Sequence, residues 1–180
     1  TIDVVLVTLQ SYASNADEII LDTANSIQVT VATETEDKTT LIVKGRLIAQ
    51  KPAKTTVTGN TIVLTDNVFN PEVVTLLQGG TIKYDTEDTN KVIGYTPPAS
   101  DGKTHGTLCK LKAYSAIYNA AGVITGYECI TYPNCTGTPV AFSSEDGTFR
   151  APQYTINSAP ANNEAPYDID IVESLPTVTA

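Results

Sequence analysis

"TLCKLKAYSAIYNAAGVITGYECITY", residues 107–132, is the stretch that decides the fold class. Cys109, Leu111 and Ala113 alternate with polar residues, a period of two that is typical of a strand with one buried face. The segment Asn-Ala-Ala-Gly at 119–122 is a turn signal between two such runs. The stretch therefore predicts an antiparallel hairpin, with strands at 107–118 and 123–132.

Most of the remaining chain also has the composition of strands. It is rich in β-branched residues, and several segments alternate apolar with polar positions. We expect further strands at 1–9, 26–32, 41–49, 55–65, 138–143, 148–156 and 167–174, with a turn at 144–147. In the last strand, Asp168 and Asp170 share one face, a pattern typical of a sheet edge that must repel an incoming strand.

Three segments of the first half are less clear. Residues 17–25 contain three consecutive large apolar residues and fit either a strand or one turn of helix. Residues 33–40, TETEDKTT, are predicted to form an acidic polar turn. The pair Gly59-Asn60 marks either a tight turn or a bulge.

One helix is expected, in "VFNPEVVTLLQGG" at residues 68–80. Asn70 is a favoured N-cap, Pro71 suits the first helical position, and Gly79 can end the helix. The apolar face of the helix is formed by Val73, Leu76 and Leu77. A helix of about two turns is not stable alone in water, so this face must pack on the sheet. Helix N-termini can bind phosphate, but Glu72 and the lack of a glycine-rich cradle favour a structural role.

Residues 84–106 are predicted to form a long loop, because Asp, Thr, Pro, Gly and Ser are dense there. Long loops in compact domains are usually disordered or used for binding. Val92, Ile93 and Tyr95 favour contact with a partner, since a solvated loop does not need apolar residues. Together with Asp85, they are the candidate contact residues of this loop.

Composition fits one globular domain that spans residues 1–180, with 41% hydrophobic and 17% charged residues. The formal net charge is −9, from 20 acidic and 11 basic residues, so a sequence-reading nucleic-acid protein is not expected. No apolar run is long enough to span a membrane, and no membrane contact is expected. The lack of Met fits either removal of an initiator before Thr1 or a trimmed chain.

The residues offer little support for enzymatic chemistry. His105 is the one histidine, and no Gly-x-Ser-x-Gly nucleophile motif is present. Cys109, Cys129 and Cys135 form neither a Cys-x-x-Cys pair nor an even disulfide set, and they make no zinc signature with one histidine. We therefore expect no enzyme, no catalytic residues, no metal and no cofactor. The acidic loops are expected to keep the domain soluble.

The order of several segments resembles the major tail tube proteins of tailed phages and prophages of Firmicutes. The segments are FNPEVVTLLQGG, IGYTPP, a lysine-bearing strand, ITGYECITYPNCTGTPVAFSSEDGTFRAPQYTINSAP and PYDIDIVESLP. The resemblance covers residues 60–176 and rests on order and spacing, since no single piece is a catalytic signature.

The resemblance implies a β-sandwich or barrel-like tail-tube fold with the helix on the outside of the sheet. It also implies a virion protein, assembled in the bacterial cytoplasm, whose subunits form hexameric rings that stack into a hollow tube for DNA. Contacts between rings would come from the 84–106 loop, the 33–40 turn or the 173–180 tail. The implied partners are other copies of the chain, the tape measure, the tail terminator, distal tail or baseplate components and, in a contractile tail, a sheath.

An acidic lumen would repel DNA phosphates and limit contact with DNA to transient, non-specific encounters. The candidate lumen acids are Glu34, Glu36, Asp37, Glu87 and Asp88, which fit ring interfaces equally well. Two other classes share the Thr-rich β composition: an exported pilus, surface-layer or adhesin subunit, and a carbohydrate-binding module. The second is less favoured because the chain has no Trp and its 9 Tyr are scattered.

Overall fold

The computed structural model describes residues 2–14, 16–140, 146 and 151–177. It contains one helix, α1 (Pro71–Gln78), and twelve strands within this part of the chain. The strands are β1 (Ile2–Ser11), β2 (Glu18–Leu21), β3 (Ala24–Thr35), β4 (Thr39–Val43), β5 (Arg46–Lys51), β6 (Thr55–Asp66), β7 (Thr81–Tyr84), β8 (Val92–Thr96), β9 (Cys109–Tyr118), β10 (Ile124–Gly137), β11 (Gln153–Ser158) and β12 (Asp168–Val172). The expected mainly β, sandwich-like fold with one short helix is confirmed.

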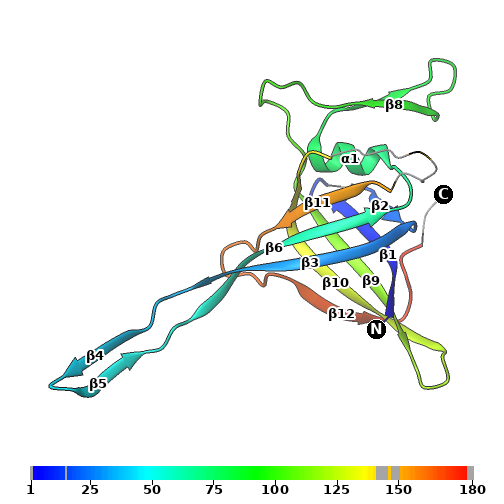
Figure 1. Cartoon of the computed structure of the whole chain (residues 1–180). Helices are drawn as coiled ribbons and strands as arrows, with labels where there is room; N and C mark the ends of the chain where they lie inside the picture. Colours follow the sequence, from blue (N-terminus) through cyan, green and yellow to red (C-terminus); the bar gives the residue numbers. More distant parts are fainter. Residues whose placement is uncertain (1, 15, 141–145, 147–150, 178–180) are drawn as a thin grey trace.

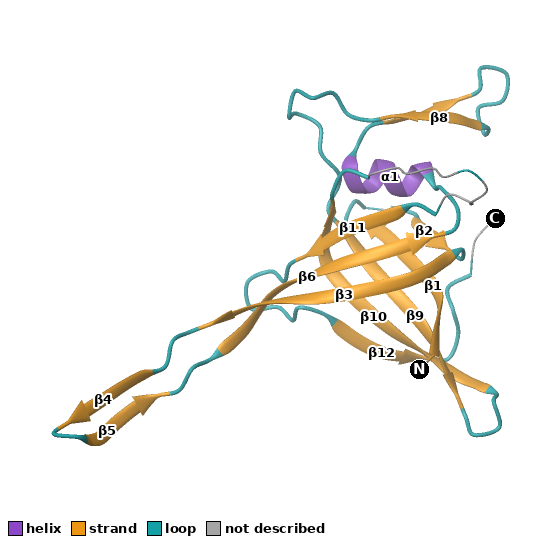
Figure 2. Ribbon diagram, viewed as in Figure 1, coloured by secondary structure: helices purple, strands orange, loops and turns teal. Residues whose placement is uncertain are grey.

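The main sheet is antiparallel, with strand order β2-β1-β9-β10-β11-β6-β3, and β12 also pairs with β10. It curls so that β11, β6 and β3 form a front layer over β1, β9 and β10 in a back layer (Figures 1 and 2). Two small sheets lie outside it, β4 with β5 and β7 with β8. The ambiguous segment 17–25 contains a strand, β2, which pairs with β1.

The curl depends on β10, which changes partners along one edge. Residues Tyr127–Thr131 pair with β12, whereas Cys135–Gly137 pair with β11. Between these two parts the register with β9 shifts, and Asn134 has a positive φ of 49°. The chain direction changes there, as expected at a bulge. The first part of β10 therefore stays in the back layer, while the second leads into the front layer.

The core lies between the two layers. The back layer contributes, among others, Val7 and Leu9 from β1, Leu111 from β9, and Tyr132 and Cys135 from β10. The front layer contributes four fully buried hydrophobic side chains: Ile62, Leu64, Tyr154 and Ile156. As the alternation predicts, Cys109, Leu111 and Ala113 all face this core.

The helix closes one end of the core. Asn70 is its N-cap, and the side-chain oxygen of Asn70 accepts hydrogen bonds from the backbone N–H groups of Glu72 (2.9 Å) and Val73 (3.4 Å). Gly79, with φ 83°, ends it. Val73 and Leu77 are buried and Leu76 is partly buried, and Val74, which was not expected on the packing face, is buried too. These side chains join the same core as both layers, so α1 covers the end of the sandwich (Figure 1). This differs from the outside position that the family resemblance implies.

The predicted turn at 33–40 is wrong. β3 continues through Thr35, and after a short gap β4 and β5 form a separate hairpin that projects far from the sandwich (Figures 1 and 2). The expected single strand at 41–49 is instead both halves of this hairpin. Lys44 and Gly45 have φ values of 48° and 76°, the left-handed pair that a two-residue hairpin turn with matching twist requires. At Gly59 the register with β3 shifts, so the Gly59-Asn60 pair marks a bulge.

The second half departs from expectation at three places. Residues 84–106 are not loop throughout, because β8 pairs with β7 across the acidic turn. Residues 138–140 form no strand, and the predicted turn at 144–147, together with the strand ends beside it, lies outside the described residues. β12 follows the predicted alternation, but Ile169 and Ile171 are exposed. β9, β10 and β11 are neighbours in chain order, whereas β12 returns to pair with β10.

Leu77→Ala is expected to lower the free energy of unfolding by about 2 to 5 kcal/mol, because Leu77 is 1% exposed and its removal leaves a cavity under the helix. Leu108→Ala is the matched control, since Leu108 is 49% exposed, and we expect a change within about 0.5 kcal/mol. Urea unfolding followed by circular dichroism at low protein concentration measures both. Equal midpoints for the two variants would show that α1 does not close the core.

Candidate assembly surfaces

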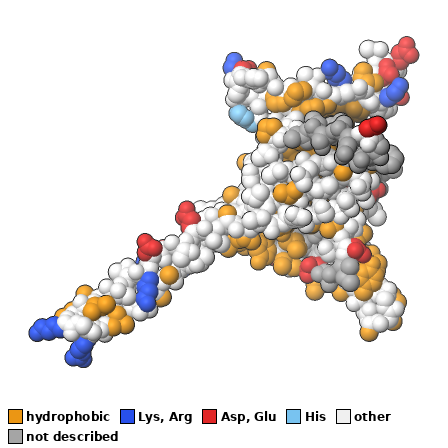
Figure 3. Space-filling model, in the orientation of Figure 1, with side chains coloured by type: hydrophobic (Ala, Val, Ile, Leu, Met, Phe, Trp, Pro, Cys, Tyr) orange, Lys and Arg blue, Asp and Glu red, His pale blue; other side chains and the backbone are white. Residues whose placement is uncertain are grey.

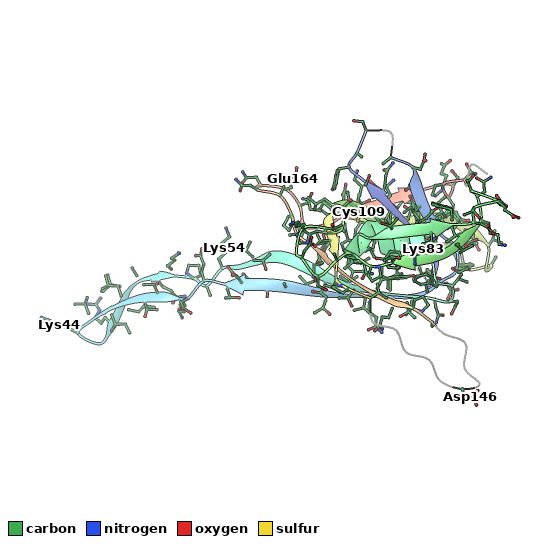
Figure 4. The ribbon with its side chains drawn as sticks, turned by 90° about the horizontal axis from the view of Figure 1, so that it is seen from above. Lys44, Lys54, Lys83, Cys109, Asp146 and Glu164 are labelled. Carbon is green, nitrogen blue, oxygen red and sulfur yellow. The ribbon has the colours of Figure 1, made fainter. Side chains whose placement is uncertain are left out.

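The β4–β5 hairpin and its flanks, residues 38–54, form a projection that we call the arm. Its large apolar side chains are between 47% and 62% exposed: Leu41, Ile42, Val43, Leu47 and Ile48. Ile42 lies directly opposite Leu47 in the antiparallel register, so these two side chains share one face of the hairpin. Lys44 is at the outer end of the arm and Lys54 near its base, away from Cys109 in the sandwich (Figure 4). The arm therefore holds apolar surface in solvent, at a distance from its own core.

The arm is also basic. It contains five of the 11 basic residues, Lys38, Lys44, Arg46, Lys51 and Lys54, and no Asp or Glu occurs from position 38 to position 65. The other six basic residues stand against all 20 acidic ones, so the chain outside the arm has a formal charge of −14. Figure 3 shows the basic side chains near the tip of the arm and acidic ones near its base. The arm and the rest of the chain thus carry opposite charge.

The candidate lumen acids lie in two separate places. Glu34, Glu36 and Asp37 are exposed where β3 leads into the arm, and Glu36 forms an ion pair with Lys51 (Oε2 to Nζ, 2.8 Å). Glu87 and Asp88 are exposed in the turn between β7 and β8. One copy of the chain does not bring the two groups together.

The β7–β8 hairpin contains the candidate contact residues of the predicted loop. Val92 and Ile93 are exposed, and with Phe69, Pro71 and Gly94 they line a shallow apolar pocket of about 350 Å³ beside the start of the helix. Asp85 pairs with Lys91 (3.3 Å) and accepts a hydrogen bond from the backbone N–H of Glu87, so this acid stabilises the turn.

Tyr95, by contrast, is an anchor between the hairpin and the helix. Its hydroxyl donates to the carbonyl oxygen of Gly79 and accepts a hydrogen bond from the side-chain amide of Gln78. The carbonyl oxygen of that amide accepts from the backbone N–H of Val140 (2.8 Å). The hairpin is therefore held against the helix end, with Val92 and Ile93 directed to solvent.

His105 lines a pocket of about 310 Å³ formed by the end of the helix, the 97–106 segment and residues 137–139. Its lining includes Gln78, Pro97 and Pro139, and none of the described residues that line it is Asp, Glu, Cys or Ser. Within the described residues, no three His, Cys, Asp or Glu side chains are grouped so that they could hold a metal ion. No helix of this part of the chain has the length and apolar character needed to cross a membrane.

The three cysteines are buried free thiols. Cys109 and Cys135 are direct partners in the β9–β10 register, and the Cys109 thiol donates to the carbonyl oxygen of Cys135 (3.5 Å). Burial, with a smaller contribution from Cys135, raises the pKa of Cys109 from its ordinary value of 9.0 to about 12. Burial likewise raises the pKa of Cys135 to about 11. Both thiols therefore stay protonated in the folded chain at neutral pH and are poor nucleophiles.

The comparisons with known proteins identify no relative by sequence: no protein-family model and no curated protein matches the chain. Among solved structures, it is similar to a chain of the anti-feeding prophage baseplate, determined by cryo-electron microscopy with six-fold symmetrisation. The two are 10% identical, with 91% of this chain and 90% of the other covered, at a TM-score of 0.37. A TM-score below 0.5 does not establish a shared fold, so this likeness decides nothing about the present chain.

Sequence reasoning missed the apolar residues of the arm as a surface. Leu41, Ile42 and Val43 are consecutive, and such a run is typical of a strand that is buried on both faces. The apolar run thus correctly indicated that both faces of the hairpin are apolar. The sequence could not show that no part of the same chain covers them.

The thiols make a pH-dependent prediction. In the unfolded chain they ionise near pH 9, but in the folded chain Cys135 and Cys109 ionise only near 11 and 12. Their contribution to stability is therefore complete below pH 9 and is lost as the pH rises from 9 toward 12. We expect the urea midpoint to fall over this range, less steeply in Cys109→Ala. An equal slope in that variant would contradict the raised pKa of Cys109.

A thiol reagent at pH 7 should react quickly with the three cysteines only after denaturation, because all three are buried in the folded chain.

Proposed function

We propose that this protein is a self-assembling structural subunit of a phage tail, and specifically the major tail tube subunit. The observation that carries the proposal is the arm, which holds apolar and basic side chains far from the chain's own core. The order of sequence segments described above supports the tail tube assignment. In this role the protein has no enzymatic activity, and its main partner is another copy of itself.

The physical argument begins with the stability of the arm. A two-stranded hairpin is at best marginally stable in water, and this one has five large apolar side chains exposed. Burying apolar surface is favourable by roughly 25 cal/mol per Å², so a partner that covers both faces of the arm stabilises it. The partner should also be acidic, because the arm has five basic residues and no acidic residue between Lys38 and Lys54. The body of a second copy meets this requirement.

Contact between an arm and a different surface of the next copy is heterologous, and such contacts form rings when they close and filaments when they do not. Stacked rings, hexameric by the family resemblance, would produce a hollow tube. The acidic body would then surround passing DNA without binding it, since like charges repel across a narrow lumen. The tape measure, terminator and baseplate components of a tail would contact the interior and ends of such a tube. A sheath would be added in a contractile tail.

Negative-stain electron microscopy and analytical ultracentrifugation test this proposal. Purified protein is expected to form rings or hollow tubes as its concentration rises. A closed dimer, or a monomer at every concentration and salt, would contradict a tube subunit.

Ile42→Asp with Leu47→Asp is expected to abolish assembly while the urea midpoint of the monomer stays unchanged, because both side chains are more than half exposed in one copy. Val68→Asp is the control. Val68 is 54% exposed but lies just before the helix, so the variant should assemble normally. Assembly of the double variant at wild-type concentration would exclude the arm as the contact.

A further inference from the structure

A second unusual surface lies at β12. Ile169 is 50% and Ile171 77% exposed, although the register places Ile169 opposite Ile130, and Ile130 opposite the buried Ala113. Residues directly opposite in a ladder share a face, so both isoleucines extend the core-facing side of the sheet. The ring of Tyr167 lies 6.2 Å from that of the buried Tyr132, which continues this apolar surface. The apolar surface of the core therefore continues along β12, where it is exposed to solvent.

The front layer leaves a matching region uncovered. Val29 and Val31 lie opposite the core residue Ile62 and the buried Asn60, yet they are 38% and 46% exposed. The side-chain amide of Asn60 donates to the carbonyl oxygen of Pro166, which places this part of the front layer beside the start of β12. Figure 3 shows hydrophobic side chains gathered over β12, below the base of the arm.

The backbone of β12 is also open. Among the described strands β12 pairs only with β10, so its other edge presents unpaired backbone groups. Such an edge is a template for a strand from another chain. Asp168, Asp170 and Glu173 make no ion pair with the described residues. Acidic side chains protect an edge against neutral or acidic strands, as expected from the sequence, but they attract a strand that is basic as well as apolar.

We propose that the free edge of β12 receives the arm of a second copy, which adds its hairpin to the sheet and covers Tyr167, Ile169 and Ile171. This inference rests on the proposed self-assembly and names the surface that the arm occupies. β4 and β12 are both five residues long, so their ladders match in length. Lys44 and Arg46 at the arm's turn then meet the carboxylates of Asp168 and Asp170.

The arm that docks must come from another copy. In Figures 1 and 4 the arm leads away from the sandwich that contains β12, and the β3–β6 ladder holds its base in that direction. The basic arm of one copy attracts the acidic body of another, whereas two arms, both basic, repel each other. Charge therefore selects contact between an arm and an edge over contact between two arms. Salt screens exposed charges, so assembly should weaken as ionic strength rises.

A charge-swap experiment tests the docking. The arm variant is Lys44→Glu with Arg46→Glu, and the edge variant is Asp168→Lys with Asp170→Lys. Each alone should need at least about tenfold more protein to assemble, because like charges then face each other. An equimolar mixture should assemble again, since the acidic arm of one fits the basic edge of the other. Circular dichroism establishes that each variant is folded.

Asp17→Lys with Asp22→Lys is the matched control, because it makes the same charge change at two exposed acids that flank β2, at one end of the strand order of the main sheet. It should assemble like the wild type and should not rescue the arm variant. An edge variant that assembles normally, or a mixture that fails to recover, overturns the docking surface while wild-type assembly still supports the proposed function. A wild-type protein that never assembles overturns both.

Cross-linking gives an independent measurement. Ile42→Cys in one copy and Ile171→Cys in another should be joined by a short bis-maleimide, while the native cysteines are buried and should not react. The pairing of Ile42→Cys with Val68→Cys is the control. Equal yields for the two pairings would contradict contact between the arm and β12.

Discussion

The change of partner along β10 is the constraint on which the rest of the structure depends. A strand edge can bond to one neighbour at each position, so a strand that bonds β12 with one part and β11 with another divides the sheet. Pro133 has no N–H to donate, and Asn134 takes a left-handed conformation, which makes this the place where the ladder can change direction. The front layer curls over the core beyond this point, and β12 stays outside it.

This division explains why the core is closed at one end and open elsewhere. The helix covers the end beside β11, with Val73, Val74 and Leu77 packed against both layers. No described helix or strand covers Ile169 and Ile171. The same sheet therefore supplies a stable interior and an apolar edge, and the edge is available without any loss of packing within the copy.

Apolar contact and charge have different roles in the proposed assembly. Exposed ion pairs contribute only about 0 to 1 kcal/mol each and weaken with salt, so they cannot hold the copies together alone. Burial of the apolar side chains of the arm and of β12 supplies most of the affinity. The basic arm and acidic body select which surfaces meet and in which direction. A net charge of −9 also limits attraction to DNA, which is consistent with the proposed tail tube.

The sequence by itself determined the local elements. Alternation in 107–132 predicts the β9–β10 hairpin, and Asn70, Pro71 and Gly79 delimit the helix, because propensity, capping and period act between near neighbours. Segment 41–49 has the pattern of a single strand, because its consecutive apolar residues obscure the Lys44-Gly45 turn. Only the tertiary structure decided that the arm leaves the sandwich and that β12 pairs with β10 at an open edge. Burial depends on partners distant in the chain or in another copy, and an apolar run has the same sequence whichever of them covers it.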